Sequence, residues 1–142
     1  LAPDGPDGAA HPLRRGEDGM HGAVVAGVGP GARYRYRLDG GAAFPDPCSR
    51  FQPEGVHGPS EVIDPAFAWT DDGWPGLSPD GLAVYELHVG TYTREGTFRA
   101  LIRQLPHLRD LGVTAIELLP VAEFPGERGW GYGGADLWAP SR

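Results

Sequence analysis

The chain has 142 residues and a formal net charge of −7, and its 12 basic residues, all arginine, are scattered rather than clustered. This charge pattern predicts no nucleic-acid partner. Glycine and proline, 23 and 15 residues, approach the content of disordered chains, but four Trp, five Tyr and five Phe indicate a folded, loop-rich protein instead.

Cysteine content, hydropathy and motif spacing bear on location and cofactors. The lone Cys48 cannot form an internal disulfide, so we expect a reducing, cytoplasmic environment. No stretch approaches the ~20 apolar residues of a membrane helix, which predicts no membrane partner. No HExxH or CxxC spacing occurs, so we expect neither a metal nor a cofactor. The sequence begins at Leu1 rather than at a methionine, so the presence of a targeting segment stays an open question. The oligomeric state is not indicated by the sequence.

The first third of the chain has the character of β structure. Turn-forming residues fill positions 1–22, and valines follow from Val24 to Val28. The stretch RYRYRLDGG at 33–41 alternates arginine with apolar residues, a period of two that predicts a half-solvated antiparallel strand ended by a turn. Residues 1–44 are therefore predicted to form part of a small β-sandwich.

Residues 45–81 are rich in proline and show no hydrophobic period. We interpret them as an ordered connector that lies on the surface of its neighbours. Trp69 and Trp74 lie on either side of an Asp-Asp-Gly turn. Such a pair could stack on a sugar ring, but we favour the interpretation that it fills a seam between domains.

The second half of the chain follows a strand–helix–strand pattern. LAVYELHVG at 82–90 is typical of a strand, and Thr97 can cap the amphipathic helix that follows. Pro106 predicts a kink or restart of that helix just before it, and Gly112 predicts its end. The apolar run 115–119 is typical of a strand covered on both faces. Together these elements predict a βαβ unit with parallel strands.

A loop dense in glycine and aromatic residues follows the second strand, with the sequence EFPGERGWGYGGADLWAP at 123–140. Loops that leave the carboxyl ends of parallel strands carry the binding surfaces of α/β proteins and barrels. Trp130 and Tyr132 therefore lie where a ligand is expected.

These segments resemble a known family. VYELHVGTYTREGTF and LPHLRDLGVTAIELLPVAEFPGERGWGYGGADLWAP resemble the opening of the (β/α)8 TIM barrel in the α-amylase superfamily of glycoside hydrolases. FPDPCSRFQPEGVHGPS resembles the joint between an N-terminal sandwich and that barrel in trehalose-releasing members. The resemblance implies an immunoglobulin-like (E-set) β-sandwich at 1–44, a connector at 45–81, and the first βαβ unit with its following loop, an incomplete barrel, at 82–142. The barrel part alone also fits branching or debranching relatives.

The resemblance implies a retaining glycosidase that hydrolyses the α-1,4 bond next to the terminal trehalose unit of a maltooligosyl-trehalose and releases trehalose. Such enzymes use two carboxyl groups about 5 Å apart. In the family these groups come from later barrel strands, beyond Arg142. We therefore expect the sequence to be a fragment with no catalytic residue and no activity of its own.

The resemblance also implies three substrate-binding residues for a maltooligosaccharide-type substrate. Tyr132 would stack beneath the sugar ring, Trp130 would line the same cleft, and Asp136 would make a polar contact. Where the family commonly has WGYDG and DLYAP, this chain has Gly133 and Trp138, so a carboxylate that could anchor the loop is missing. The alternative that both aromatic side chains only pack the loop against the barrel stays open.

Other candidates have structural interpretations. Glu86 and Glu117 lie in the middle of the predicted strands rather than at their ends, so they are interpreted as structural. His88 is interpreted as a hydrogen-bonded core histidine. A different class of function also stays open, because residues 1–80 alone could be a carbohydrate-binding or purely architectural module; of these two we favour the architectural one.

Overall fold

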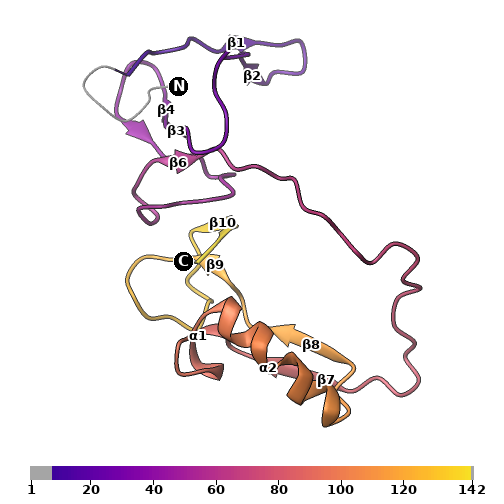
Figure 1. The fold of residues 1–142 in the computed structure, drawn as a ribbon. Helices are drawn as coiled ribbons and strands as arrows, with labels where there is room; N and C mark the ends of the chain where they lie inside the picture. Colours follow the sequence, from indigo (N-terminus) through magenta and orange to yellow (C-terminus); the bar gives the residue numbers. More distant parts are fainter. Residues whose placement is uncertain (1–7, 142) are drawn as a thin grey trace. The chain divides into compact units, whose positions relative to one another are not determined.

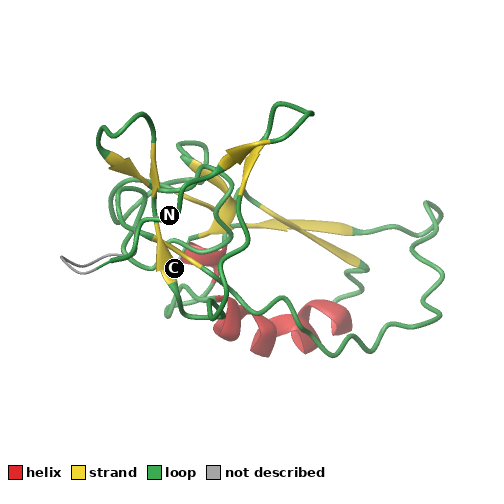
Figure 2. Ribbon diagram, turned by 90° about the horizontal axis from the view of Figure 1, so that it is seen from above, coloured by secondary structure: helices red, strands yellow, loops and turns green. Residues whose placement is uncertain are grey.

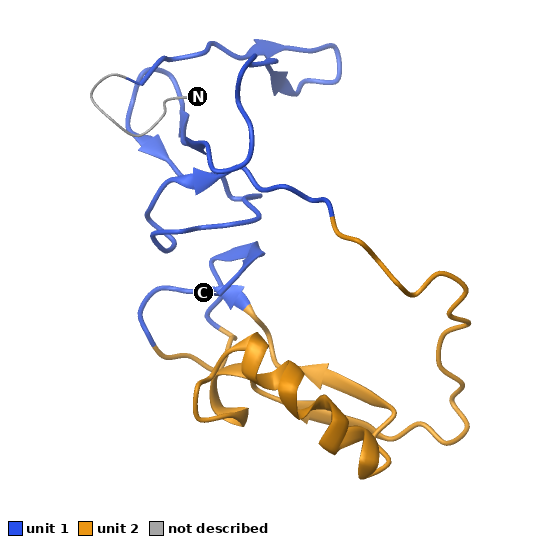
Figure 3. Cartoon of the chain, in the orientation of Figure 1, with its two compact units in different colours: residues 1–66, 122–127, 133–142 blue, residues 67–121, 128–132 orange. Residues whose placement is uncertain are grey.

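The structure, a computed structural model, describes residues 8–141. The chain divides into two compact units that interleave along the sequence (Figure 3). The first unit consists of residues 1–66, 122–127 and 133–142, and the second of residues 67–121 and 128–132.

The first unit is built from short antiparallel strands. The pairs are β1 (Arg14–Arg15) with β2 (His21–Gly22), β3 (Arg33–Tyr34) with β6 (Ser60–Glu61), β4 (Tyr36–Arg37) with β5 (Ala43–Phe44), and β9 (Ala122–Glu123) with β10 (Asp136–Pro140). Each pair forms a separate two-stranded sheet in the described part of the chain.

The strand predicted around residues 33–38 is divided between two partners. Tyr34 pairs with Ser60 in one sheet, whereas Tyr36 pairs with Phe44 in another. The predicted alternation is confirmed for the two tyrosines, because their rings touch edge to face with centroids 5.8 Å apart. Leu38, in contrast, is exposed. A change of hydrogen-bonding partner after two residues is a tertiary feature that a period of two does not reveal.

The predicted turn after β4 is confirmed. Asp39 and Gly40 both have positive φ, 49° and 73°, and the Gly41 amide donates to the Leu38 carbonyl oxygen at 2.8 Å. Two consecutive positive φ values define the type I′ turn that joins the strands of tight hairpins, and Asp-Gly is a preferred pair for it.

The proline-rich segment after β5 is held by side-chain hydrogen bonds. The Tyr34 hydroxyl donates to Asp46 Oδ2 at 2.6 Å, and the Asp46 amide donates to Ser60 Oγ at 2.9 Å. Gln52 and Ser49 are fully buried in the same segment. Because prolines prevent a regular backbone ladder, buried side-chain groups provide the partners instead.

The second unit contains the predicted βαβ arrangement (Figures 1 and 2). Strand β7 (Val84–Leu87) pairs in parallel with β8 (Ala115–Leu118), from Val84 opposite Ala115 to Leu87 opposite Leu118. The short helix α1 (Val89–Tyr92) follows β7, and α2 (Phe98–Asp110) connects the strands. The buried core of this unit is Leu87, Val89, Leu101 and Leu108. In the part of the chain that the structure describes, no helix is both long and apolar enough to cross a bilayer.

The predicted ends of α2 are confirmed, but the predicted restart before Pro106 is wrong. Thr97 Oγ1 accepts from the Ala100 amide at 3.2 Å, and Gly112 follows the helix with a φ of +92°. The helix runs without a break from Phe98 to Asp110. Pro106 removes one amide, which would have bonded to the Ile102 carbonyl. Ile102 lies on the exposed side of the helix, where water can take the place of that amide.

Between Phe67 and Gly81, the structure contains neither helix nor strand. Trp69 and Trp74 are exposed there, and the Trp69 ring lies edge-on against Phe67. The structure thus places neither tryptophan in the core of the second unit, and the predicted seam stays a prediction.

Replacement of Thr97 with alanine tests the helix cap in the protein that carries this chain. The variant loses the side-chain acceptor of the Ala100 amide, so we expect protection of that amide from hydrogen exchange to fall by about 1 kcal/mol. The matched variant Thr97→Ser keeps an acceptor oxygen and should retain most of the protection. Equal exchange rates in the alanine variant and the parent would contradict the assignment of the cap.

Candidate substrate-binding loop

The carboxyl ends of β7 and β8 lie at the same edge of the parallel pair. The Leu119 amide continues the ladder by donating to the Leu87 carbonyl oxygen at 2.9 Å. His88 then follows β7 directly, and Pro120 follows β8 after one residue. This edge is where parallel α/β structures place their binding loops.

Residues 128–132, here called the aromatic loop, return to this edge and belong to the second unit. His88 Nε2 lies 3.0 Å from the Gly129 carbonyl oxygen. The imidazole of His88 also contacts the Trp130 ring edge to face, with centroids 5.6 Å apart and planes at 76°. The aromatic loop is therefore attached to the end of β7 through its backbone and through a side chain.

A second attachment lies at the end of β8. Gly131 has a φ of +87°, and a Cβ atom built on it would lie 1.9 Å from the Pro120 carbonyl oxygen. No other residue fits there, because both the backbone conformation and the space require glycine. The aromatic loop thus passes directly against the backbone that follows β8.

The two aromatic side chains predicted to bind substrate both lie on this loop with open faces. Trp130 is 67% exposed and Tyr132 is 76% exposed. The loop that carries them contacts the residues that follow β7 and β8, through Gly129 and Gly131. Their contact with a sugar stays a prediction.

Asp136, the third predicted site residue, belongs to the first unit. It begins β10 opposite Glu123 of β9 and is only 5% exposed. Its Oδ2 atom has no hydrogen-bond partner among the described residues. Burial raises the pKa of Asp136, the nearby Asp46 carboxylate raises it further, and His57 lowers it. In this structure Asp136 is therefore a buried carboxyl group, and its role as a polar substrate contact stays a prediction.

The departures from the family pattern leave the loop intact. A Cβ atom at Gly133 would meet nothing within 4 Å, so the space at this position does not require glycine. Trp138 in β10 is exposed. Glycine is required at position 131 of the aromatic loop but not, on grounds of space, at position 133.

The structure assigns His88 a role that sequence reasoning missed. We expected a hydrogen-bonded core histidine; the hydrogen bond is present, but the ring is half-buried and its partner is the aromatic loop. The sequence prediction placed His88 inside a strand over residues 82–90, whereas β7 ends at Leu87 and His88 follows it directly. Glu86 and Glu117 are register partners in the middle of the two strands, as predicted.

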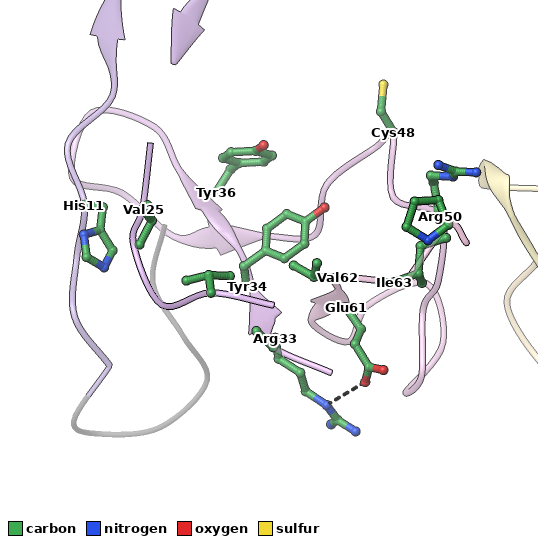
Figure 4. A pocket seen from close by; sticks show the side chains of 13 residues that line it. His11, Val25, Arg33, Tyr34, Tyr36, Cys48, Arg50, Glu61, Val62 and Ile63 are labelled. Atoms are coloured by element: carbon green, nitrogen blue, oxygen red, sulfur yellow. Dashed lines mark ion pairs between the residues drawn. The ribbon is translucent and has the colours of Figure 1, made fainter. Parts of the chain in front are cut away.

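The first unit contains a separate cavity of about 580 Å³ (Figure 4). Tyr34 and Tyr36 line it together with Val25, Val62 and Ile63. Several polar groups at its wall have partners within the chain: Arg33 pairs with Glu54 and Glu61, and the Tyr34 hydroxyl donates to Asp46. Burial raises the pKa of both tyrosines, and the Asp46 carboxylate raises them further. We assign no ligand to this cavity.

No group of three or more His, Cys, Asp or Glu side chains in the described residues is arranged to hold a metal ion.

Comparison with known proteins places the chain among its relatives. No family model matches it. It is 48% identical over 127 residues to the malto-oligosyltrehalose trehalohydrolase of Saccharolobus solfataricus, covering 89% of this chain and 23% of the relative. It is 55% identical over 114 residues to the enzyme of the same name from Deinococcus radiodurans, covering 80% of this chain and 19% of the relative. The chain is a relative of the malto-oligosyltrehalose trehalohydrolases. It spans about a fifth of their length.

Two further matches agree with the resemblance to the α-amylase superfamily. The crystal structure of a candidate α-amylase from Salmonella typhimurium superimposes with a TM-score of 0.84 at 50% identity, covering 91% of this chain and 22% of that one. A 1,4-alpha-glucan branching enzyme of Xanthomonas oryzae is 37% identical over 153 residues, covering 95% of this chain and 21% of the relative. The predicted family membership is confirmed. The fold, mostly strands with few helices, is that of the corresponding part of the α-amylase-like structure.

Replacement of Asp136 with asparagine tests the buried carboxyl group. A raised pKa means that the protonated form is favoured in the folded state, so its stabilising contribution is complete below the unfolded value of about 3.9 and is lost as the pH rises through the folded value. Asparagine does not titrate. The stability of Asp136→Asn relative to the parent should therefore increase from pH 4 towards neutrality in urea unfolding. If the difference in stability between Asp136→Asn and the parent did not change with pH, the raised pKa of a buried Asp136 carboxyl group would be contradicted.

Proposed function

We propose that the protein carrying this chain is a glycoside hydrolase that cleaves the α-1,4 bond next to the terminal trehalose unit of maltooligosyl-trehalose and releases trehalose. The observation that supports this most strongly is the identity to several relatives of that name, among them 47% over 137 residues in Mycobacterium tuberculosis and 55% over 106 residues in Arthrobacter ramosus. Each of these matches covers most of this chain.

The proposal includes a division into domains. Residues 1–44 are part of an N-terminal immunoglobulin-like (E-set) β-sandwich, residues 45–81 are the connector, and residues 82–142 are the first βαβ unit and following loop of a (β/α)8 barrel. The antiparallel strand pairs of the first unit support the sandwich. The parallel pair β7–β8, connected through α2, supports the barrel, which is built from such units.

In this proposal the chain supplies substrate binding rather than bond cleavage. A retaining glycosidase needs two carboxyl groups that flank the scissile bond, one as nucleophile and one as acid. Glu86 and Glu117 do not fit these roles, because they lie mid-strand and not at the carboxyl edge. The exposed faces of Trp130 and Tyr132 fit the apolar C–H face of a glucose ring, and the Tyr132 hydroxyl can hydrogen-bond to a sugar hydroxyl.

The same proposal includes the substrate, the cofactors, the partners and the location of the enzyme. The substrate is a maltooligosaccharide-type chain, and the retaining mechanism involves no cofactor or metal. Neither nucleic acid nor membrane is a partner, and the location is cytoplasmic, in keeping with the single Cys48.

The identity to a branching enzyme favours a second candidate, glucan transfer. Incubation of the full-length protein with maltooligosyl-trehalose separates the two. Hydrolysis releases free trehalose and a shorter maltooligosaccharide. A branching enzyme would instead convert linear glucan into branched glucan without trehalose, and that result would replace the proposed function.

Replacement of Tyr132 tests the sugar-stacking role in the full-length protein. Because stacking of aromatic groups contributes about 0.5–1.5 kcal/mol beyond area burial, Tyr132→Ala should lower kcat/KM for trehalose release by about two- to tenfold. Tyr132→Phe keeps the ring face and should lose less. Trp138→Ala, at an exposed aromatic residue of β10 outside the aromatic loop, serves as the control and should match the parent. Unchanged kinetics of Tyr132→Ala would remove this residue from the site.

A further inference from the structure

We propose that His88 is the positioning residue that holds the aromatic loop in its sugar-binding arrangement. The contact between His88 and the loop is observed in the structure and does not depend on any function. Its consequence for sugar binding rests on the proposed function. His88 itself transfers no group and touches no reacting atom in this proposal.

The first step of the argument is the polarity of the contact. A carbonyl oxygen can only accept, so the Nε2–H of His88 donates to Gly129 across 3.0 Å. The other ring nitrogen, Nδ1, is buried and has no hydrogen-bond partner among the described residues. The His88 ring is therefore attached to the chain around it through Nε2 alone of its two nitrogens, among the described residues. Gly129 directly precedes Trp130, so the hydrogen bond fixes the peptide that leads into the tryptophan.

The second step is the ring contact. The edge-to-face geometry with Trp130, at 5.6 Å and 76°, is a preferred arrangement of aromatic pairs. It engages one part of the indole and leaves 67% of the tryptophan exposed. One imidazole therefore restrains both the backbone and the side chain of the residue that would meet the sugar.

The third step is the rigidity of His88. It follows Leu87, a buried core residue that ends β7, and its carbonyl oxygen accepts from the amides of Thr91 and Tyr92 as α1 begins. A Cβ atom on Gly90 would lie 3.0 Å from His88 Cε1 and 3.3 Å from Nδ1. A side chain at position 90 would therefore press on the imidazole ring and displace it by a few tenths of an ångström.

The two attachments of the aromatic loop lie on either side of Trp130. His88 holds Gly129, and the close approach to the Pro120 carbonyl holds Gly131. The loop is therefore fixed to the residues that follow both parallel strands. Removal of the His88 contact would release Gly129, whereas Gly131 would stay held against Pro120.

Three substitutions in the full-length protein separate the components of the contact. His88→Gln keeps an N–H donor at a similar reach, His88→Phe keeps the ring without the donor, and His88→Leu keeps neither. His107→Leu, at an exposed histidine of α2, is the matched control. Gly90→Ala disturbs the ring of His88 without changing it and provides an independent variant should His88→Leu fail to fold.

The first measurement does not depend on substrate. In protein labelled with 5-fluorotryptophan, the ¹⁹F resonance of Trp130 is assigned by its loss in Trp130→Phe. We expect this resonance to shift or broaden in His88→Leu and Gly90→Ala, with smaller changes in the Gln and Phe variants and none in His107→Leu. An unchanged Trp130 resonance in His88→Leu or Gly90→Ala would overturn the proposal, whatever the protein hydrolyses.

The second measurement is the kinetics of trehalose release. We expect His88→Leu to raise KM about tenfold with a smaller effect on kcat, and His88→Gln and His88→Phe each to restore part of the loss. A purely structural role would lower the folded fraction and leave the KM of the remaining enzyme unchanged, and that result would overturn the positioning role. If the parent protein releases no trehalose, the proposed function fails, and the fluorine measurement still decides the contact.

Discussion

The parallel pairing of β7 with β8 is the constraint on which the rest of the second unit depends. It brings residues about thirty positions apart into register, from Val84 opposite Ala115 to Leu87 opposite Leu118. Helix α2 lays Leu101 and Leu108 against Leu87, the buried residue that ends β7, whereas the other residues of the two strands are partly or largely exposed. Since both strands run in the same direction, their last residues share one edge. His88 and Pro120 become neighbours of the same loop for this reason alone.

The aromatic loop shows how a rigid scaffold can present exposed side chains without burying them. Trp130 and Tyr132 have few contacts of their own, yet the residues beside them are held through a hydrogen bond to Gly129 and through the close passage of Gly131 along the backbone at Pro120. The attachment uses glycines and a histidine, so the flat faces of the two aromatic rings stay open. A surface fixed in this way pays little conformational entropy when a ligand binds.

The first unit follows a different principle. Its strands are only two residues long in most pairs. Asp46 joins the proline-rich segment between β5 and β6 to these strands, because its carboxylate accepts from the Tyr34 hydroxyl and its amide donates to the Ser60 hydroxyl. Polar partners in a partly buried setting specify one arrangement because an unpaired group there is costly. This explains how a segment without regular secondary structure is ordered. Side-chain hydrogen bonds thus order the first unit, whereas a helix that packs on a parallel strand pair orders the second.

The sequence by itself determined the local elements and the family. Hydrophobic period, the Thr97 cap and Gly112 defined α2, the apolar runs defined β7 and β8, and Asp39-Gly40 defined a hairpin turn, because each depends on residues close together in the chain. The sequence also placed Trp130 and Tyr132 beyond the end of a parallel strand. Only the tertiary structure decided that β3 and β4 pair with different strands, that α2 continues through Pro106, that Asp136 is buried, and that His88 contacts the aromatic loop. The physical reason is that each of these features depends on whether a residue faces a group distant in the sequence or faces solvent. The contact between His88 and Gly129, for example, joins residues 41 positions apart that no local pattern connects.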